Sequence, residues 1–193
     1  SSLGTTLYTN GALIVLGMFA SNSAVGQFAA SEKIVRAVKK LYAPIAQAIF
    51  PAISLKMKQD KRAGLQFVRK TALIMGSLMF VLSLLLFVFA VPIVNLLLGS
   101  QYEDSIIPLR VMAIIPFVVT LSNILGVQTM LNLDYGREYS LIVLIIACSG
   151  LIASLVLTSL YQEIGASFTL LIIEILLLSS LCMFYNMKIK KTL

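Results

Sequence analysis

A group of charged side chains interrupts one apolar stretch of the sequence: Glu32, Lys33, Arg36, Lys39 and Lys40. At about 100° per residue of an α-helix these positions fall on an arc of about 120°, and Gln47 continues along it. Glu32 can pair with Arg36 four residues later, which leaves the other cations unmatched. Guanidinium and ammonium groups bind phosphate oxygens, so the four cations, here called the cationic stripe, predict a site for a polyanion such as a pyrophosphate.

Three polar residues outside this group stand in apolar surroundings. Arg110 and Gln128 would share one helical angle within the segment 106–131, which makes both candidates for lining a cavity. Arg110 also lies near a predicted membrane interface, so the alternative is that its guanidinium simply extends into water. Glu174 interrupts a long apolar run. It is either a carboxyl group hydrogen-bonded to a neighbouring helix or, like Glu32, a candidate cavity or coupling residue.

Two prolines follow the charged group on the same predicted helix. Pro44 and Pro51 each lack the backbone N–H of a regular turn and crowd the preceding turn. They are therefore candidates for a hinge, the alternative being a fixed kink without a mechanistic role.

The residue inventory excludes several kinds of chemistry. The chain has no histidine, so it has no imidazole base and no histidine metal ligand. Cys148 and Cys182 lie far apart in apolar runs, where we expect buried and unpaired thiols. The absence of a Gly-Lys pair excludes an ATP-binding P-loop. We therefore expect neither a metal site nor a cofactor.

The elements that must position these residues are membrane-spanning helices. Of the 193 residues, 59% are hydrophobic and 12% are charged, about half the charged fraction of a soluble domain. The apolar runs reach the length of about 20 helical residues that crosses a bilayer. We predict an all-α polytopic membrane protein, a single six-helix lobe over residues 1–193, with spans at about 3–20, 27–56, 67–91, 106–131, 140–160 and 164–187.

The basic residues predict the orientation of these spans. The connector after the second span with its flanks, the connector after the fourth span and the C-terminal tail carry ten Lys and Arg residues, whereas the connectors after the first, third and fifth spans carry none. Because basic loops remain in the cytoplasm, both ends of the chain are predicted to be cytoplasmic. Topology and an anionic ligand then explain the net charge of +7, and nucleic acid is not an expected partner.

The charged second span admits two arrangements. One is an amphipathic helix on the membrane surface, with its cations at lipid phosphates. The other spans the bilayer and turns the stripe into a hydrated interior, with Lys33 about 9 Å and Lys40 about 20 Å below the outer end. The spanning arrangement is favoured because it keeps the basic connectors on one side of the membrane. Charges at such depth are costly unless they are hydrated or paired, which favours a functional role.

Four segments of the sequence resemble one family of membrane proteins: AVGQFAASEKI at 24–34, AQAIFP at 46–51, IVNLLLGSQY at 93–102 and LGVQTML at 125–131. They are similar to motifs of bacterial polysaccharide flippases, above all the O-antigen (lipid-linked oligosaccharide) flippases, in the superfamily that includes multidrug (MATE) exporters. Phe28 departs mildly from the family, which often has Tyr there. Such proteins have twelve or more helices in two six-helix lobes, so the chain resembles a C-terminal lobe whose expected partner is an N-terminal lobe of the same protein.

The resemblance implies transport by alternating access, without a catalytic residue or a covalent step. The implied substrate is an undecaprenyl-pyrophosphate-linked O-antigen or polysaccharide unit, flipped across the bacterial inner membrane, and the polysaccharide polymerase machinery is a further expected partner. In this scheme the cationic stripe and Gln47 hold the pyrophosphate. Two alternatives stay open: a drug or cation antiporter of the same superfamily, and a non-transporting membrane scaffold.

Overall fold

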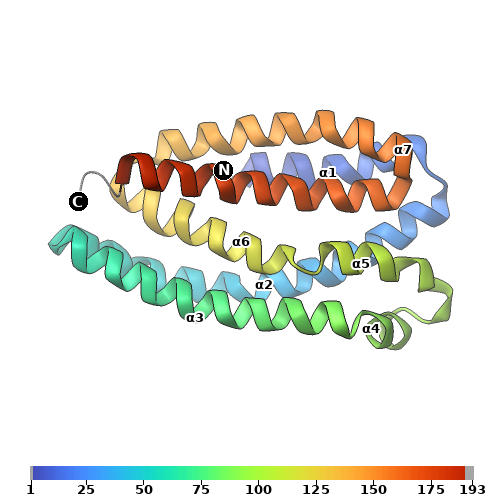
Figure 1. The fold of residues 1–193 in the computed structure, drawn as a ribbon, viewed down its shortest axis with the longest axis horizontal. Helices are drawn as coiled ribbons and strands as arrows, with labels where there is room; N and C mark the ends of the chain where they lie inside the picture. The colour runs from blue at the N-terminus through green and yellow to red at the C-terminus, as the bar shows by residue number, and fades with distance from the viewer. Residues whose placement is uncertain (1, 190–193) are drawn as a thin grey trace.

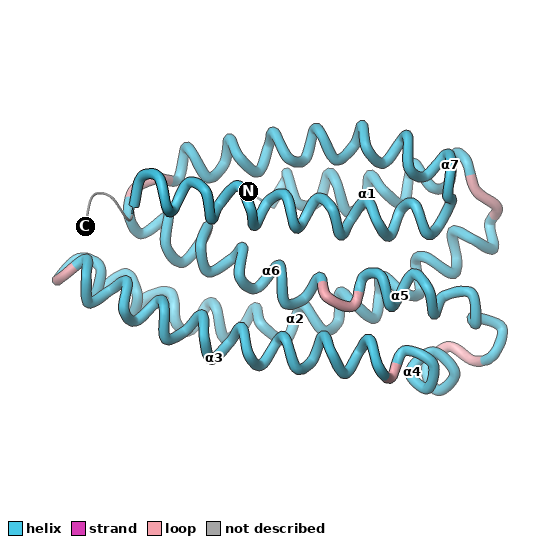
Figure 2. Tube along the Cα trace, viewed as in Figure 1, coloured by secondary structure: helices cyan, strands magenta, loops and turns pink. Residues whose placement is uncertain are grey.

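The computed structural model describes residues 2–189, with side chains from Gly11 onward, and this part of the chain is helical almost throughout (Figure 2). No strand occurs within it, so the all-α class predicted from the sequence is confirmed. The long helices are α1 (Ser2–Phe19), α2 (Asn22–Gln59), α3 (Lys61–Val88) and α7 (Gly136–Phe184). Between α3 and α7 lie α4 (Ala90–Leu97), η1 (Ser100–Ser105), α5 (Ile106–Met112), α6 (Ile115–Asn123), η2 (Ile124–Met130) and η3 (Leu131–Leu133), and η4 (Tyr185–Ile189) follows α7.

The long helices lie alongside one another, and their connectors gather at two ends of the molecule (Figure 1). One end holds the turn between α2 and α3, the turn before α7 and the C-terminal side of α7, while the opposite end holds the α1–α2 turn and η1. Lys58 and Arg137 therefore belong to one end and Glu103 to the other. The described connectors thus carry their basic residues at one end only, as the predicted topology requires, and this end also holds the acidic Asp60 and Asp134. Lys190 and Lys191 lie outside the described residues.

Gln162 reverses the chain within α7, so that this element forms two antiparallel arms (Figure 1). Its φ of 47° and ψ of −127° lie outside the helical region. Gly165 permits the reversal, because a Cβ atom at this position would collide with the carbonyl oxygen of Leu157. The two arms correspond to the predicted spans 140–160 and 164–187.

The segment 106–131, predicted as one regular helix, is interrupted. α5 ends at Met112 and α6 begins at Ile115, with a loop between them in Figure 2, and η2 continues α6 as a π-helix. Pro116 at the start of α6 lacks the N–H group that would bond back across the break. The shared helical angle expected for Arg110 and Gln128 is therefore wrong, because the break and the wider π turns change the direction of the later side chains.

α2 and α3 are longer than their predicted spans and form a helical hairpin around Asp60. Asp60 caps α3, since its Oδ1 accepts a hydrogen bond of 2.9 Å from the backbone N–H of Arg62. α3 ends at Val88, after which α4 turns across the bundle and is seen end-on in Figure 1. The predicted span 67–91 thus includes the first residues of a separate short helix.

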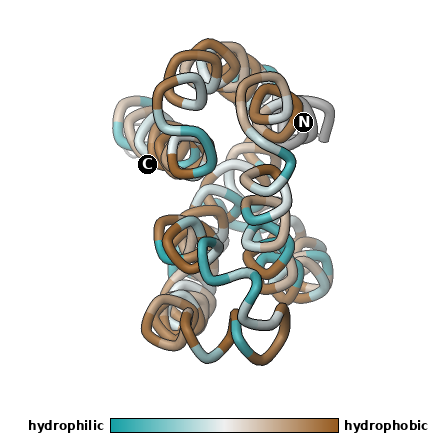
Figure 3. Tube along the Cα trace, turned by 90° about the vertical axis from the view of Figure 1, so that its right-hand side faces the viewer, coloured by the Kyte–Doolittle hydropathy of each residue, from teal (hydrophilic) through white to brown (hydrophobic). Residues whose placement is uncertain are grey.

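Large apolar side chains lie on the outside of the bundle as well as in its interior. Leu73 and Leu84 of α3 and Ile145 and Ile152 of α7 are exposed, and Figure 3 shows apolar turns around the periphery. Within residues 2–189, three segments are long and apolar enough to cross a membrane: Lys61–Val88, Ser100–Leu133 and Gly136–Ile189. A surface of this kind needs lipid or protein against it, so the chain is a polytopic membrane protein.

The two cysteines, like these apolar side chains, lie on the outside of the bundle. Cys148 and Cys182 are unpaired, as expected, but both are exposed, so the prediction of buried thiols is wrong. An apolar run indicates burial in a soluble protein, whereas in this bundle the apolar faces of α7 also point outward.

Two apolar clusters hold α2 lengthwise within the bundle. Phe28 and Val35 pack in one cluster with Met112 of α5. Ile53 packs in the other with Met79 of α3. This packing supports the spanning arrangement of α2, because a helix lying flat on the membrane surface would cross its neighbours instead of running along them.

Candidate functional site

The cationic stripe lies on one continuous helix. α2 is unbroken from Asn22 to Gln59, so residues spaced three, four and seven apart share a face. Lys33, Arg36 and Lys40 are exposed on this face, and Lys39 is half-buried. Like charges along about two helical turns create a positive potential that attracts a polyanion.

Glu32 forms the ion pair predicted for it. The Nε atom of Arg36 donates a hydrogen bond of 2.9 Å to Oε1 of Glu32, and the Glu32 side chain is 12% exposed. Among the residues whose side chains the structure describes, no ion pair joins Lys33, Lys39 or Lys40 to a carboxylate. The pair therefore holds Arg36 along α2 while the lysines keep their charge available to a ligand.

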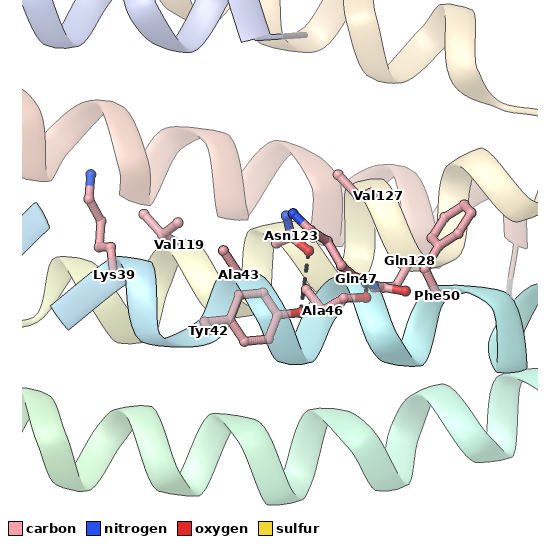
Figure 4. Close-up of a pocket in the computed structure, with 10 residues that line it drawn as sticks. All are labelled: Lys39, Tyr42, Ala43, Ala46, Gln47, Phe50, Val119, Asn123, Val127 and Gln128. Carbon is pink, nitrogen blue, oxygen red and sulfur yellow. Dashed lines mark hydrogen bonds between the residues drawn. The ribbon is translucent and has the colours of Figure 1, made fainter. Parts of the chain in front are cut away.

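A groove with a volume of about 440 Å³ lies between α2 and the α6–η2 segment and begins beside Lys39 (Figure 4). Its further lining residues are Tyr42, Ala43, Ala46, Gln47 and Phe50 of α2 and Val119, Asn123, Val127 and Gln128 of α6–η2. The groove therefore joins one cation of the stripe to amide groups, a tyrosine and a phenyl ring. Gln47 and Gln128, both candidates from the sequence, meet in it, whereas the sequence did not point to Tyr42 or Phe50.

Hydrogen bonds fix the polar groups of this groove. The hydroxyl of Tyr42 donates to Oδ1 of Asn123 at 3.3 Å, and Nε2 of Gln128 donates to the carbonyl oxygen of Ala46 at 2.9 Å. A carbonyl can only accept, so it determines which way the Gln128 amide is turned. Oε1 of Gln128 then has no hydrogen-bond partner, although the residue is only 2% exposed. A buried acceptor in this state costs about 1–3 kcal/mol unless water or a ligand donates to it.

The π-helix η2 brings Asn123 and Gln128 to the same groove. In an α-helix, side chains five residues apart diverge by about 140°. In a π-helix the hydrogen bonds run between residues five apart, so those residues stand nearly above one another. The Thr129 hydroxyl, 2.8 Å from the carbonyl oxygen of Ile124, also follows this wider spacing. Short π segments are frequent at functional sites, which is consistent with a binding role for the groove.

Lys39 also borders a second, much smaller gap of about 10 Å³ between α2, the α5–α6 break and the second arm of α7. Glu32 and Glu174 line this gap, and Glu174 is only 3% exposed. The structure thus brings together two acidic residues that the sequence could not place relative to one another. The gap is about large enough for one water molecule.

Arg110 and the two prolines lie outside the groove. The guanidinium carbon of Arg110 lies 6.0 Å from the ring centre of Phe87 on α3, at the limit of a cation–π contact. Pro44 and Pro51 are exposed within α2 and do not interrupt its helical backbone. A hinge at either proline therefore stays a prediction.

A buried polar network, not predicted from the sequence, ties the first turns of α2 to η1. The Ser105 hydroxyl donates to the carbonyl oxygen of Gln27 at 2.9 Å, and the Ser31 hydroxyl donates to the carbonyl oxygen of Ser105 at 2.8 Å. Nε2 of Gln27 donates to the carbonyl oxygen of Gln101 at 3.0 Å. Both serine side chains are fully buried. The network fixes the end of α2 that lies nearest to Lys33.

The chemistry available to these residues is recognition of a charged and polar ligand. Within residues 2–189, no group of three or more Cys, Asp or Glu side chains is placed to hold a metal ion. The stripe supplies cations, and the groove supplies hydrogen-bond donors and acceptors beside an aromatic ring. Together they fit a ligand with an anionic part and a neutral polar part.

Comparison with known proteins agrees with this picture. A protein of Escherichia coli (strain K12) named "Putative O-antigen transporter" is 34% identical over 184 residues, which make up 95% of this chain and 44% of that protein. The chain thus spans less than half the length of this curated relative. No solved structure gives a significant match. Residues 1–107 match the family model described as polysaccharide biosynthesis protein. Because the match covers more than half of the chain, the chain belongs to this polysaccharide biosynthesis family, as its resemblance to polysaccharide flippases indicated.

Proposed function

We propose that this chain is the C-terminal lobe of a flippase that moves an undecaprenyl-pyrophosphate-linked O-antigen or polysaccharide unit across the bacterial inner membrane. The family match and the similarity to an O-antigen transporter by name support a polysaccharide transporter. The observation that carries the more specific proposal is the exposed cationic stripe on a helix packed lengthwise in an apolar bundle.

A pyrophosphate has the charge that the stripe needs. Arg36 can present two N–H groups to a phosphate, while Lys33 and Lys40 supply mobile point charges. Three uncompensated cations at membrane depth are costly, so water or an anionic ligand has to accompany them. A bound pyrophosphate offsets this cost, and the polyprenyl tail of the same molecule can remain in lipid.

The direction of the stripe fits a cavity between two lobes. Lys33, Arg36 and Lys40 are exposed, whereas Phe28 and Val35 attach the opposite side of α2 to the bundle. An N-terminal lobe placed against the exposed face would enclose a hydrated cavity lined by the stripe. Rocking of the two lobes would then open the cavity to the cytoplasm and to the outer side in turn, with both ends of this chain cytoplasmic.

Glu32 and Glu174 are the candidates for coupling transport to an ion gradient. Both line the gap beside Lys39, so a change in the charge of either carboxyl group acts directly on one cation of the stripe. A change in the protonation of this pair would then be accompanied by a movement of α2 and of the second arm of α7. Bending of α2 at Pro44 or Pro51 would give the stripe freedom to follow the substrate.

Surface display of O-antigen in cells tests this function. The full-length protein would carry Lys33→Ala, Arg36→Ala and Lys40→Ala together, and we expect display to be abolished while the protein still accumulates in the membrane. The matched control, Lys58→Ala with Lys61→Ala and Lys70→Ala, removes the same charge from the α2–α3 hairpin and should retain display. A normal amount of surface polysaccharide in the stripe variant would contradict the proposal.

The same variants separate the alternative functions. A drug or cation antiporter would show cation efflux that depends on acidic residues, whereas the exposed face of α2 is cationic. For a non-transporting scaffold, reversal of the stripe charges would change the assembly of the protein in the membrane and leave lipid flipping unaffected. If flipping is intact, the polysaccharide polymerase machinery would be a downstream partner of this protein.

A further inference from the structure

We propose that the groove between α2 and α6–η2 is a saccharide subsite, which holds the sugar adjoining the pyrophosphate of the transported lipid (Figure 4). The inference rests on the proposed function and concerns the part of the substrate that the cationic stripe does not bind. It assigns that part to residues of this lobe.

The groove continues the stripe along α2. Lys39 borders both, and Phe50, at the far end of the α2 side of the groove, lies about 16 Å further along the helix axis. A ligand with its pyrophosphate on the stripe therefore places the group attached to that pyrophosphate within reach of the groove. The volume of about 440 Å³ falls in the range of roughly 300–1,000 Å³ found for ligand pockets.

The lining offers both kinds of hydrogen-bonding group beside an aromatic ring. Oε1 of Gln128 is an acceptor without a partner, buried in the wall of the groove, so a donor of a ligand reaches it only after a small movement of this side chain. The amide groups of Gln47 and Asn123 can donate as well as accept, and Figure 4 shows them grouped with Gln128 between Lys39 and Phe50. A sugar hydroxyl both donates and accepts, and the C–H face of a sugar ring can pack on the phenyl ring of Phe50.

Other parts of the lipid fit this groove less well. A polyprenyl chain has no donor for Oε1 of Gln128 and would cover the amide groups without hydrogen bonds. An ionised phosphate presents acceptors only, so it cannot meet this acceptor either. A ligand that carries hydroxyl groups can hydrogen-bond to the amide groups of Asn123 and Gln47, and the apolar face of a sugar ring can cover the largely apolar rest of the lining.

Binding of two lipids to the purified full-length protein tests the subsite. One probe is undecaprenyl pyrophosphate that carries the oligosaccharide unit, and the other is undecaprenyl pyrophosphate without sugar. The variants are Gln47→Leu alone, at an exposed position, and Gln47→Leu combined with Asn123→Leu. Gln66→Leu, on an exposed position of α3, is the matched control.

We expect the double variant to bind the glycosylated lipid about tenfold more weakly, as for a site that loses hydrogen bonds to hydroxyl groups, and Gln47→Leu to show a smaller loss. Both should bind the sugar-free lipid as the wild type does, because the subsite reassigns Gln47 from the pyrophosphate, where the sequence placed it, to the sugar. Gln66→Leu should bind both lipids unchanged. Unchanged binding of the glycosylated lipid, or an equal loss for both lipids, would overturn the subsite. If the wild type binds the two lipids equally, the subsite fails while the proposed function stands, and if it binds neither, the proposed function fails as well.

Discussion

Arg36 donates a hydrogen bond from Nε to Oε1 of Glu32 at 2.9 Å, one turn earlier on α2. The Arg36 side chain is 45% exposed and the Glu32 side chain 12% exposed, so the pair lies at the border between the bundle and the exposed face. An ion pair this accessible adds little to stability, on the order of 0–1 kcal/mol. Its consequence is geometric, because a bond through Nε keeps the guanidinium along the stripe and leaves its two terminal nitrogen atoms chemically able to bind a phosphate.

The guanidinium fork of Arg36 should matter beyond its charge. Arg36→Lys keeps the charge and removes the bidentate geometry, so we expect about tenfold weaker binding of undecaprenyl pyrophosphate to the full-length protein. Lys40→Arg, the reverse exchange on the same face, should keep the affinity of the wild type or improve it. Equal affinities of the wild type and Arg36→Lys would show that Arg36 acts only as a point charge.

The Ser31–Ser105 network should hold η1 against α2. Ser105→Ala removes a buried hydroxyl that bonds to Gln27 and should lower the free energy of unfolding by about 1–3 kcal/mol. Ser100→Ala, on an exposed position of the same segment, should leave stability unchanged. Thermal unfolding of the detergent-solubilised full-length protein measures both, and faster proteolysis at η1 in Ser105→Ala alone would accompany the loss. Equal stability of the two variants would contradict the role of the network.

The reversal of α7 should require a residue without a side chain at position 165. Gly165→Ala places a Cβ against the carbonyl oxygen of Leu157, and we expect a loss of about 1–3 kcal/mol from the strain of overpacking. Gly17→Ala is the control, because a Cβ at Gly17 would meet nothing within 4 Å. Membrane expression and thermal unfolding of the two variants give the comparison. A Gly165→Ala protein as stable as Gly17→Ala would mean that the two arms of α7 separate more easily than the structure indicates.

Glu174 should affect coupling more than binding. Glu174→Gln keeps the size of the side chain and removes its ability to lose a proton beside Lys39 and Glu32. We expect lipid flipping in vesicles to lose its dependence on a proton gradient, while the affinity for the lipid stays within about threefold of the wild type. Glu103→Gln, on the exposed η1 segment, is the matched control and should keep that dependence. A Glu174→Gln protein that still responds to the gradient would exclude this carboxyl group from coupling.

Much of the architecture could be predicted because bilayer thickness imposes a length on each apolar segment. The reversal at Gln162 falls between the last two predicted spans, and the basic residues of the described connectors lie at one end of the bundle. The stripe could also be predicted, because a continuous helix converts the spacing from Lys33 to Lys40 into one face without help from other elements. The Glu32–Arg36 pair follows from the same local rule.

The remaining features depend on contacts between distant segments. The break before α6 and the π turns of η2 change the direction of the side chains after Pro116. A regular helical projection therefore placed Gln128 on the same face as Arg110, whereas in the structure Gln128 donates a hydrogen bond to Ala46. Ser105 and Gln27 lie far apart in the sequence, and serine carries no periodic signal that would join them. Cys148 was misplaced for a different reason, since an apolar neighbourhood in a membrane protein does not distinguish a lipid-facing position from a core position.

Direct binding of undecaprenyl pyrophosphate to the purified full-length protein shows whether the cationic face of α2 holds the pyrophosphate. We expect the affinity to fall at least about 100-fold when Lys33, Arg36 and Lys40 are all replaced with Ala, since each replacement removes a charge-assisted contact. The control that replaces Lys58, Lys61 and Lys70 should bind as the wild type does. Equal affinities of the stripe variant and this control would mean that the net charge of the protein, and not this face of α2, determines binding, and would overturn the assignment of the pyrophosphate to the stripe.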